Sequence, residues 1–145
     1  MSRNKARVVA MQALFQLDDD PDSVSTVAEV RSEEESLDER DIEYLKSLIS
    51  SVSANKNSID SQIGGFSIDW DVSRLGKVER AILRLAIGEM LYIDDVPTSV
   101  AINEAVMLGK RYGADQASKF INGILGKFSR EILKESKKSG ERKSD

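Results

Sequence analysis

The sequence contains neither cysteine nor histidine. Without cysteine there can be no disulfide bond, no thiol nucleophile and no cysteine metal site. The absence of histidine removes the usual general base at neutral pH and the commonest nitrogen ligand for metals. Carboxylate or lysine chemistry stays open. The composition nevertheless favours a protein that is not an enzyme and that has no catalytic residues, no metal site and no cofactor.

Long hydrophobic runs are also absent. The uncharged apolar stretches fall far short of the roughly 20 residues that a membrane-spanning helix needs. The chain begins Met-Ser-Arg-Asn-Lys and then becomes amphipathic, without the compact apolar run and small-residue cleavage site of a signal peptide. We therefore expect no contact with a membrane and a location in the cytoplasm.

The formal net charge of −4 is unevenly distributed along the chain. Residues 1–17 contain three bases and no acid, whereas residues 18–45 contain twelve acids and two bases. Residues 74–130 contain nine bases and six acids. Because binding responds to the local field and not to the total charge, the two base-rich regions offer surface for an acidic partner such as RNA.

Hydrophobic residues recur at helical intervals along most of the chain, and no segment alternates convincingly with the period of a strand. The pattern predicts helices over residues 3–17, 23–35, 36–64, 73–92, 98–113 and 115–133, the third of which begins with a capping box of Ser36 and Glu39. A loop or short turn is expected at 64–73, around Phe66 and Trp70. We therefore predict an all-α fold, a bundle of six or seven helices.

The length of 145 residues fits one domain. We expect a single helical domain over residues 1–133, built from two subbundles at roughly 1–65 and 66–133. The remaining residues, 134–145, are polar, and a disordered tail is expected there.

Several separated segments resemble one family in order and spacing. In the second half of the chain these are Arg80-Ala-Ile-Leu-Arg-Leu-Ala86, Glu89, Asp95-Val96-Pro97, Ala101-Ile-Asn-Glu-Ala-Val106 and Lys119-Phe-Ile-Asn-Gly-Ile-Leu125. Near the N-terminus they are Ala6-Arg7 and Gln12-Ala-Leu-Phe15. Together they resemble the signature of the NusB family of transcription antitermination factors. The resemblance covers about residues 3–130 and is weakest at 20–60.

The resemblance implies a small all-helical protein of two subdomains that binds the boxA element of nascent ribosomal RNA transcripts together with NusE, a ribosomal small-subunit protein. It also implies that the pair acts with other Nus factors on RNA polymerase, so that transcription reads through premature terminators. Neither the residues nor the resemblance decides the oligomeric state, and a homodimer that hides the RNA site stays open.

Single-stranded RNA is held by cations on its phosphates and by planar side chains beneath its bases. In the family the first helix is arginine-rich where it meets RNA, which in this chain points to Arg3, Lys5 and Arg7. The chain departs from that pattern at Asn4 and Lys5, so it has fewer fork-shaped donors and we expect weaker unaided RNA binding. Three bases at an N-terminus also fit a role in solubility alone.

A second group of RNA-binding candidates surrounds the expected interhelix turn near Gly113. The candidates are Lys110, Tyr112, Gln116 and Lys119, and Arg111 belongs to the same mixed basic rim around the turn. Tyr112 offers an aromatic ring at a helix end, and Gln116 leaves the centre of the turn uncharged. Phe15 is a further stacking candidate, although its spacing from Met11 fits a core position about as well.

The helix expected at 73–92 carries a basic face formed by Arg74, Lys77, Arg80 and Arg84. Such a face is as often a solvated surface as a binding site. The resemblance places NusE contacts largely in the C-terminal subdomain, which makes Lys77, Glu79 and Arg80 the candidates for protein binding. The acidic stretch 18–43 is most simply a solvated surface, although it also fits a role in repelling RNA from one side.

Two other functions stay open. The same fold occurs as the N-terminal domain of some ribosomal RNA cytosine methyltransferases, so an RNA-binding accessory of such an enzyme is one alternative. The enzyme itself needs a catalytic cysteine, which this chain lacks. The other alternative is a helical adaptor that binds only proteins. In that case partner binding survives the loss of Arg3, Lys5 and Arg7.

Overall fold

The computed structural model describes residues 3–66 and 75–144, and for residues 133–144 it describes the backbone alone. Seven α-helices and one short 3-10 turn occupy these ranges, and no strand occurs within them. The helices are α1 (Arg3–Phe15), α2 (Val24–Glu34), α3 (Glu39–Ala54), α4 (Lys56–Phe66), α5 (Lys77–Tyr92), α6 (Thr98–Tyr112) and α7 (Ala117–Ser144), and the 3-10 turn η1 spans Pro21–Ser23. The predicted all-α fold is confirmed.

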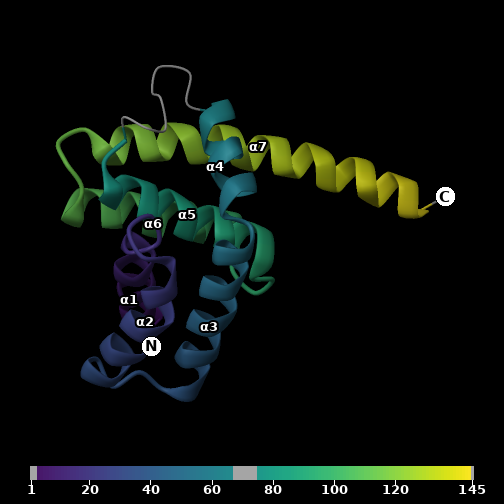
Figure 1. Ribbon diagram of the computed structural model, residues 1–145. Helices are drawn as coiled ribbons and strands as arrows, with labels where there is room; N and C mark the ends of the chain where they lie inside the picture. The colour runs from purple at the N-terminus through teal and green to yellow at the C-terminus, as the bar shows by residue number, and fades with distance from the viewer. Residues whose placement is uncertain (1–2, 67–74, 145) are drawn as a thin grey trace.

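The helices form two groups that cross one another (Figure 1). Helices α5, α6 and α7 run across the view of Figure 1, and α1, α2 and α3 stand below them. Helix α5 packs against α1, α3, α4, α6 and α7. Every residue from Ala81 to Glu89 is consequently buried, including the charged residues of that stretch. Helix α5 is therefore the centre of the fold.

The single long helix expected at 36–64 is two helices, α3 and α4, separated at Asn55. The side-chain amide of Asn55 donates to the carbonyl oxygen of Ser51 at 2.8 Å, and its backbone N–H bonds the same oxygen. A short polar side chain that bonds nearby backbone in this way competes with the regular helix ladder, which explains the break. The expected capping box is also wrong. Ser36 has a positive φ of 53°, and the cap is Asp38, which accepts from the N–H of Asp41.

Helix α7 is longer than expected. Residues 134–144, for which a disordered polar tail was predicted, continue α7 to Ser144 and project beyond the other helices (Figure 1). The segment is rich in lysine and glutamate, which are good helix formers even where nothing packs against them. Among the described residues, no helix is both long and apolar enough to cross a membrane.

Some expectations fall on residues that the structure does not describe. The predicted loop at 64–73 overlaps α4 as far as Phe66, and the rest of it, with Trp70, lies outside the described residues. Arg74 lies outside them too. The division into subbundles at 1–65 and 66–133 stays a prediction.

Gly88 lets α5 approach α3 closely. A Cβ atom built on Gly88 would lie 2.6 Å from Cγ2 of Val52 and 2.9 Å from Cδ1 of Leu48, both on α3. Both neighbours are fully buried, so neither can move away freely. We expect Gly88→Ala to lower the free energy of unfolding by about 1–3 kcal/mol through overpacking, measured by urea denaturation.

Gly123 provides the matched control. It lies in α7, is exposed, and has nothing within 4 Å of the position of an added Cβ. Gly123→Ala should therefore stabilise the protein by up to about 1 kcal/mol through helix propensity alone. A gain in stability at both positions would show that α3 and α5 are not closely packed at Gly88.

Candidate nucleic-acid interface

The N-terminal part of α1 and the C-terminal part of α6 line a hollow of about 500 Å³, here called the α1–α6 groove. Its lining residues are Asn4, Lys5, Arg7, Val8, Glu104, Met107, Leu108, Lys110 and Arg111. Three of its four bases, Lys5, Lys110 and Arg111, are exposed, and they come from both helices. The groove therefore brings together cations that are more than one hundred residues apart in the sequence.

The local sequence explains why these cations face outward. In α1, Ala6, Val9 and Ala10 are buried against the core, which leaves Lys5 on the free side of the helix. In α6 the buried stripe is Ala101, Ala105, Leu108 and Gly109. Lys110 and Arg111 follow this stripe in the last turn, where positive charge is favourable opposite the helix dipole. Amphipathic patterning thus places bases on both walls of the groove.

The turn between α6 and α7 extends this surface. Tyr112 is 37% exposed, and the guanidinium carbon of Arg111 lies 5.4 Å from the centre of its ring. Gln116 and Lys119 are also exposed, and Gln116 has a positive φ of 71° immediately before α7 begins. The second group of predicted residues is therefore close to the α1–α6 groove in the chain, with one aromatic ring accessible to solvent.

Phe15 lies apart from this surface. It is about ten residues beyond Lys5 on α1, roughly 15 Å along the helix axis. Its ring is partly buried against the core, and the ammonium of Lys77 lies 4.5 Å from the ring centre. Of the two roles expected for Phe15, base stacking or packing in the core, its position in the structure fits packing against the core.

Arg7 differs from an exposed phosphate contact, because its side chain is only 6% exposed. Its Nε lies 3.0 Å and 3.2 Å from the two carboxylate oxygens of Glu89, and its Nη2 lies 3.1 Å from one of them. Burial lowers the pKa of Arg7, but the hydrogen bonds and charge of Glu89 outweigh burial and hold the pKa above its ordinary value. Arg7 thus fastens α1 to α5 at the edge of the groove.

Arg3 stands at the start of α1 and is partly exposed. Its guanidinium lies 3.3 Å from a carboxylate oxygen of Asp95 and 4.7 Å from the ring centre of Tyr44. An exposed ion pair of this kind contributes little to stability, so Arg3 can exchange Asp95 for another anion at small cost. Tyr44 itself is buried, and burial followed by the charge of Glu89 raises the pKa of its hydroxyl.

The three residues predicted to bind protein are held by contacts within the chain. Glu79 is buried and accepts a hydrogen bond of 2.8 Å from the N–H of Ala114, in the turn before α7. Arg80 lies 3.2 Å from a carboxylate oxygen of Asp18, and Lys77 forms an ion pair with Asp19. Lys77 keeps the most exposed side chain among the cations of α5 that form described ion pairs.

Arg84 joins the same ion-pair network. Its side chain is only 3% exposed and contacts Asp18 at 3.0 Å and Asp60 at 2.8 Å, while Lys56 contacts both carboxylates. Burial raises the pKa of Asp18, but the hydrogen bond from Arg84 and the charges of its three basic neighbours outweigh burial and hold the pKa below its ordinary value. The described part of the basic face on α5 is thus neutralised internally by acids of other elements.

Sequence reasoning missed several residues that shape the site. Met107, 59% exposed, lines the α1–α6 groove together with Glu104 and Asn4. The helical period of α6 places Met107 on the exposed side and Leu108 on the buried side, so the exposure of Met107 could have been predicted from the sequence. The pairing of Arg7 with Glu89 had no such signal, because the two residues are 82 positions apart. In the described residues, no group of three or more metal-binding side chains is arranged to hold a metal ion.

The Arg7–Glu89 pair can be tested by removing one partner or both. Arg7→Ala leaves the buried carboxylate of Glu89 without its partner, so we expect the free energy of unfolding to fall by about 3–5 kcal/mol in urea denaturation. Replacing both residues with methionine removes both charges and keeps most of the volume, and should recover most of the lost stability. If the double variant is as unstable as Arg7→Ala, the loss does not arise from an uncompensated charge.

The network around Asp18 predicts a dependence of stability on pH. We expect Asp18→Asn to lower the free energy of unfolding by about 1 kcal/mol at neutral pH. A carboxyl group whose pKa is lower in the folded state contributes its full stabilisation above its ordinary pKa, about 3.9, and loses it as the pH falls through the lowered value. In urea titrations, the difference between wild type and variant should be constant above about pH 5 and shrink below about pH 4. A difference that stays constant into strong acid would contradict this account.

Comparison with known proteins agrees with this architecture. Residues 4–130 match the model of the NusB family. The chain is 41% identical over 137 residues to the transcription antitermination protein NusB of Natranaerobius thermophilus, covering 92% of this chain and 99% of that protein.

Solved structures agree as well. The structure of T. maritima NusB superposes with a TM-score of 0.81 at 33% identity, covering 90% of this chain and 92% of that one. A chain from a crystal structure of the antitermination factors NusB and NusE in complex with dsRNA superposes with a TM-score of 0.78 at 28% identity, covering 89% and 96%. With agreement in sequence and fold over nearly all of its length, this chain belongs to the NusB family.

Proposed function

We propose that this protein is a transcription antitermination factor that binds boxA RNA of nascent ribosomal RNA transcripts together with NusE. It works by assembling RNA and protein, without catalysis, and acts in the cytoplasm where these transcripts are made. Other Nus factors and RNA polymerase are reached indirectly, through the assembled complex. Membership of the NusB family supports this function, as does a related structure that combines NusB, NusE and RNA.

The observation that carries the proposal is the α1–α6 groove. Lys5, Lys110 and Arg111 are exposed cations that line this groove, which supports a role in neutralising phosphates along one strand. Tyr112, Gln116 and Lys119 continue the surface at the adjoining turn, where the exposed ring of Tyr112 is available for stacking on an unpaired base. Cations that follow a backbone next to an aromatic platform are typical of sites for single-stranded RNA.

The two N-terminal arginines take different parts in this proposal. Arg3 contacts RNA directly by exchanging its exposed pair with Asp95 for a phosphate. Arg7 acts mainly by position, because its guanidinium is held by Glu89 while the residue lines the groove. Few arginine guanidinium groups on this surface are therefore available to bind phosphates. We propose that NusE raises RNA affinity by adding its own contacts to this weak site.

The proposed NusE contact lies at the N-terminal end of α5. Lys77 is partly exposed there and covers the ring of Phe15, which is itself partly exposed. Glu79 and Arg80 support the same helix end through their contacts with Ala114 and Asp18. A partly open cation–aromatic pair on a fixed helix end suits a protein interface, where aromatic and basic anchors dominate.

The groove is tested by removing its exposed cations. We expect the triple variant Lys5→Gln/Lys110→Gln/Arg111→Gln to bind a boxA oligonucleotide at least tenfold more weakly in fluorescence anisotropy at moderate salt. Loss of three phosphate contacts should also flatten the dependence of log K on log salt by about 2, at roughly 0.7 per contact on a single strand. NusE should raise the affinity of the wild type.

The matched control is Arg40→Gln/Lys46→Gln/Arg130→Gln, which removes three exposed cations from α3 and α7. It should leave both affinity and salt dependence nearly unchanged. Equal losses in the two triple variants would mean that only overall charge matters and that the groove is not the site. If the wild type binds boxA and scrambled RNA equally weakly with or without NusE, the function is that of a protein adaptor.

A further inference from the structure

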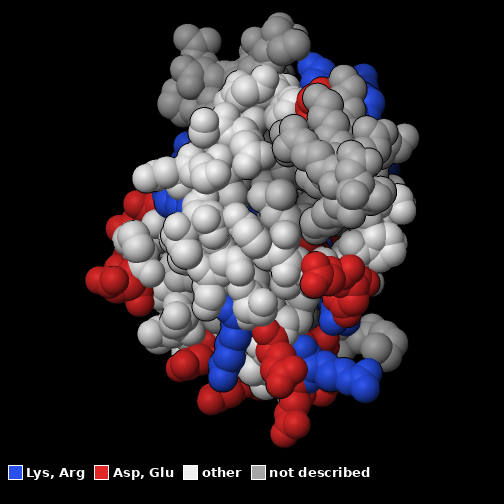
Figure 2. All heavy atoms as spheres, turned by 90° about the vertical axis from the view of Figure 1, so that its right-hand side faces the viewer, with Lys and Arg blue, Asp and Glu red and all other residues white. Residues whose placement is uncertain are grey.

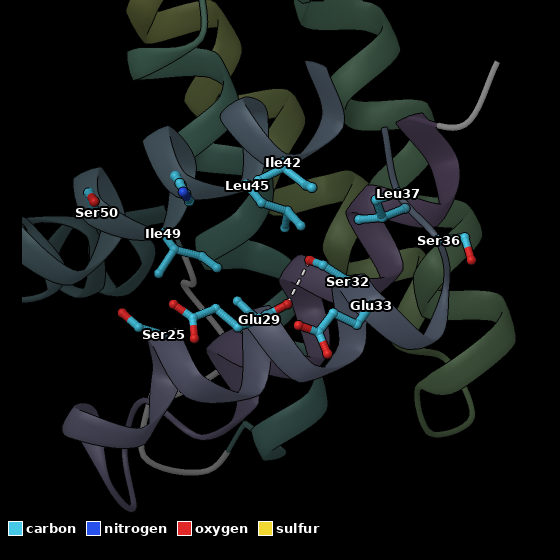
Figure 3. Close-up of a pocket in the computed structure, with 12 residues that line it drawn as sticks. Ser25, Glu29, Ser32, Glu33, Ser36, Leu37, Ile42, Leu45, Ile49 and Ser50 are labelled. Carbon is cyan, nitrogen blue, oxygen red and sulfur yellow. Dashed lines mark hydrogen bonds between the residues drawn. The ribbon is translucent and has the colours of Figure 1, made fainter. Parts of the chain in front are cut away.

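A second hollow, here called the α2–α3 groove, lies between α2 and α3 and has a volume of about 520 Å³ (Figure 3). Its lining residues are Ser25, Ala28, Glu29, Ser32, Glu33, Ser36, Leu37, Ile42, Leu45, Lys46, Ile49 and Ser50. None of them belongs to the α1–α6 groove. The volume falls in the range of roughly 300–1,000 Å³ that is typical of binding pockets.

The two walls of this groove differ in residue size, which explains why it is open. Large aliphatic side chains, Ile42, Leu45 and Ile49, face α2 from α3 (Figure 3). The facing side of α2 carries small residues at helical spacing, Ser25, Ala28 and Ser32. The hydroxyl of Ser32 bonds the carbonyl oxygen of Ala28 at 2.6 Å, so it does not reach across to α3. Leu45 and Ile49, only 2% and 6% exposed, form an apolar floor at the bottom of the groove, and Ile42 beside them is partly exposed. The small residues of α2 leave the groove open above this floor.

The rim on α2 is acidic. Glu29 and Glu33, one turn apart, line the groove and are exposed. On α3, Glu39 lies about two turns before Lys46 on the same side and is exposed as well. Figure 2 shows acidic side chains, with lysine and arginine side chains among them, at the lower end of the molecule, the end at which α2 and α3 are joined in Figure 1. The exposed carboxylates of Glu29 and Glu33 favour a basic partner on the α2 side of the groove.

We propose that the α2–α3 groove binds a basic amphipathic helix of a protein partner. Aliphatic side chains spaced at i, i+3 or i+4, and i+7 would lie on Ile42, Leu45 and Ile49. Lysine or arginine on the flank of that helix would stand against Glu29 and Glu33. The apolar floor supplies affinity, and the charge of the rim selects a basic helix over an acidic one. This surface is independent of the RNA-binding function proposed above.

A designed peptide provides the probe, because the natural partner is not identified. The test peptide is a fluorescein-labelled 18-residue helix with leucines on one face and lysines elsewhere. One comparison peptide keeps the leucines and replaces every lysine with glutamate, and another keeps the composition but scatters the leucines around the helix. We expect anisotropy of the full-length protein to show binding of the leucine–lysine helix at least tenfold tighter than that of either comparison peptide.

Two variants that change the charge of the groove rim in opposite directions test whether the peptide binds in the α2–α3 groove. Glu29→Lys/Glu33→Lys should weaken binding of the leucine–lysine helix about tenfold and favour the leucine–glutamate helix instead. Lys46→Glu, on the opposite rim, should strengthen binding of the leucine–lysine helix several-fold. Asp115→Lys/Glu131→Lys makes the same change of charge at exposed positions near and on α7, and should have little effect. All these rim residues are exposed, so the variants are expected to fold, which circular dichroism checks.

Three outcomes would overturn the proposal. The first is equal binding of the lysine and glutamate helices, or no response to either rim variant. The second is a set of peptide-induced amide shifts, in two-dimensional NMR spectra, that lie outside α2 and α3. The third is concentration-dependent self-association in sedimentation velocity that Glu29→Lys/Glu33→Lys abolishes, which would assign the groove to a second copy of this chain. Glu29→Lys/Glu33→Lys should not weaken RNA binding, because neither residue lines the α1–α6 groove, so failure here is distinguishable from failure of the RNA proposal.

Discussion

Helix α5 is buried on every side from Ala81 to Glu89, and this burial determines how its charged residues are used. A charge removed from water costs several kcal/mol unless a partner compensates it. Glu89 finds that partner in Arg7 of α1, and Arg84 finds it in Asp18 and Asp60. Each compensating residue comes from outside α5. Any apolar surface could cover the apolar residues of α5, but its buried charges need partners of opposite charge. This need restricts which elements can pack around the central helix.

The same constraint shapes the candidate RNA surface. Asn4 and Val8 lie one turn apart on the groove-facing side of α1, and Lys5 and Arg7 flank them on opposite edges. Because Arg7 turns toward Glu89, its edge of the groove is fixed against α5. Lys5 occupies the other edge and stays exposed. The buried ion pair and the buried apolar stripe of α1 together fix the rotation of this helix about its own axis. That rotation leaves Lys5 exposed and turns Arg7 inward.

Hydrophobic periodicity was sufficient to predict most of the fold, because the apolar stripes of α1, α5, α6 and α7 follow the helical repeat closely. It could not detect the break at Asn55, since the apolar residues on either side keep helical spacing while one side chain bonds the backbone. It also could not predict that the polar residues after 133 continue α7, because an unpacked helix depends on propensity and leaves no apolar stripe.

The candidate site was harder to predict than the fold. Exposure of Lys5, Lys110 and Lys119 follows from their place opposite the buried stripes, and the structure agrees. The burial of Arg7 and Glu79 could not be foreseen, because it depends on partners distant in the chain, Glu89 and Ala114. Local sequence describes the face on which a charge lies. It does not show which residues of another helix pack against that face. Arginines with similar neighbours in sequence can therefore be exposed on the surface or buried in an ion pair.

Internal pairing also explains how a chain with a net charge of −4 keeps exposed cations together in the α1–α6 groove, the candidate surface for RNA. Asp18 and Asp19, at the end of the first helical segment, are paired with Arg80, Arg84 and Lys77 of α5. Without those acids, the N-terminal half of α5 would form a second basic surface that competes for phosphate. Among the other acids of the early segment, Glu29 and Glu33 line the α2–α3 groove, which shares no lining residue with the α1–α6 groove. The acidic segment therefore neutralises the cations of α5 and leaves those of the α1–α6 groove exposed. For RNA binding, the position of each acid matters more than the total charge.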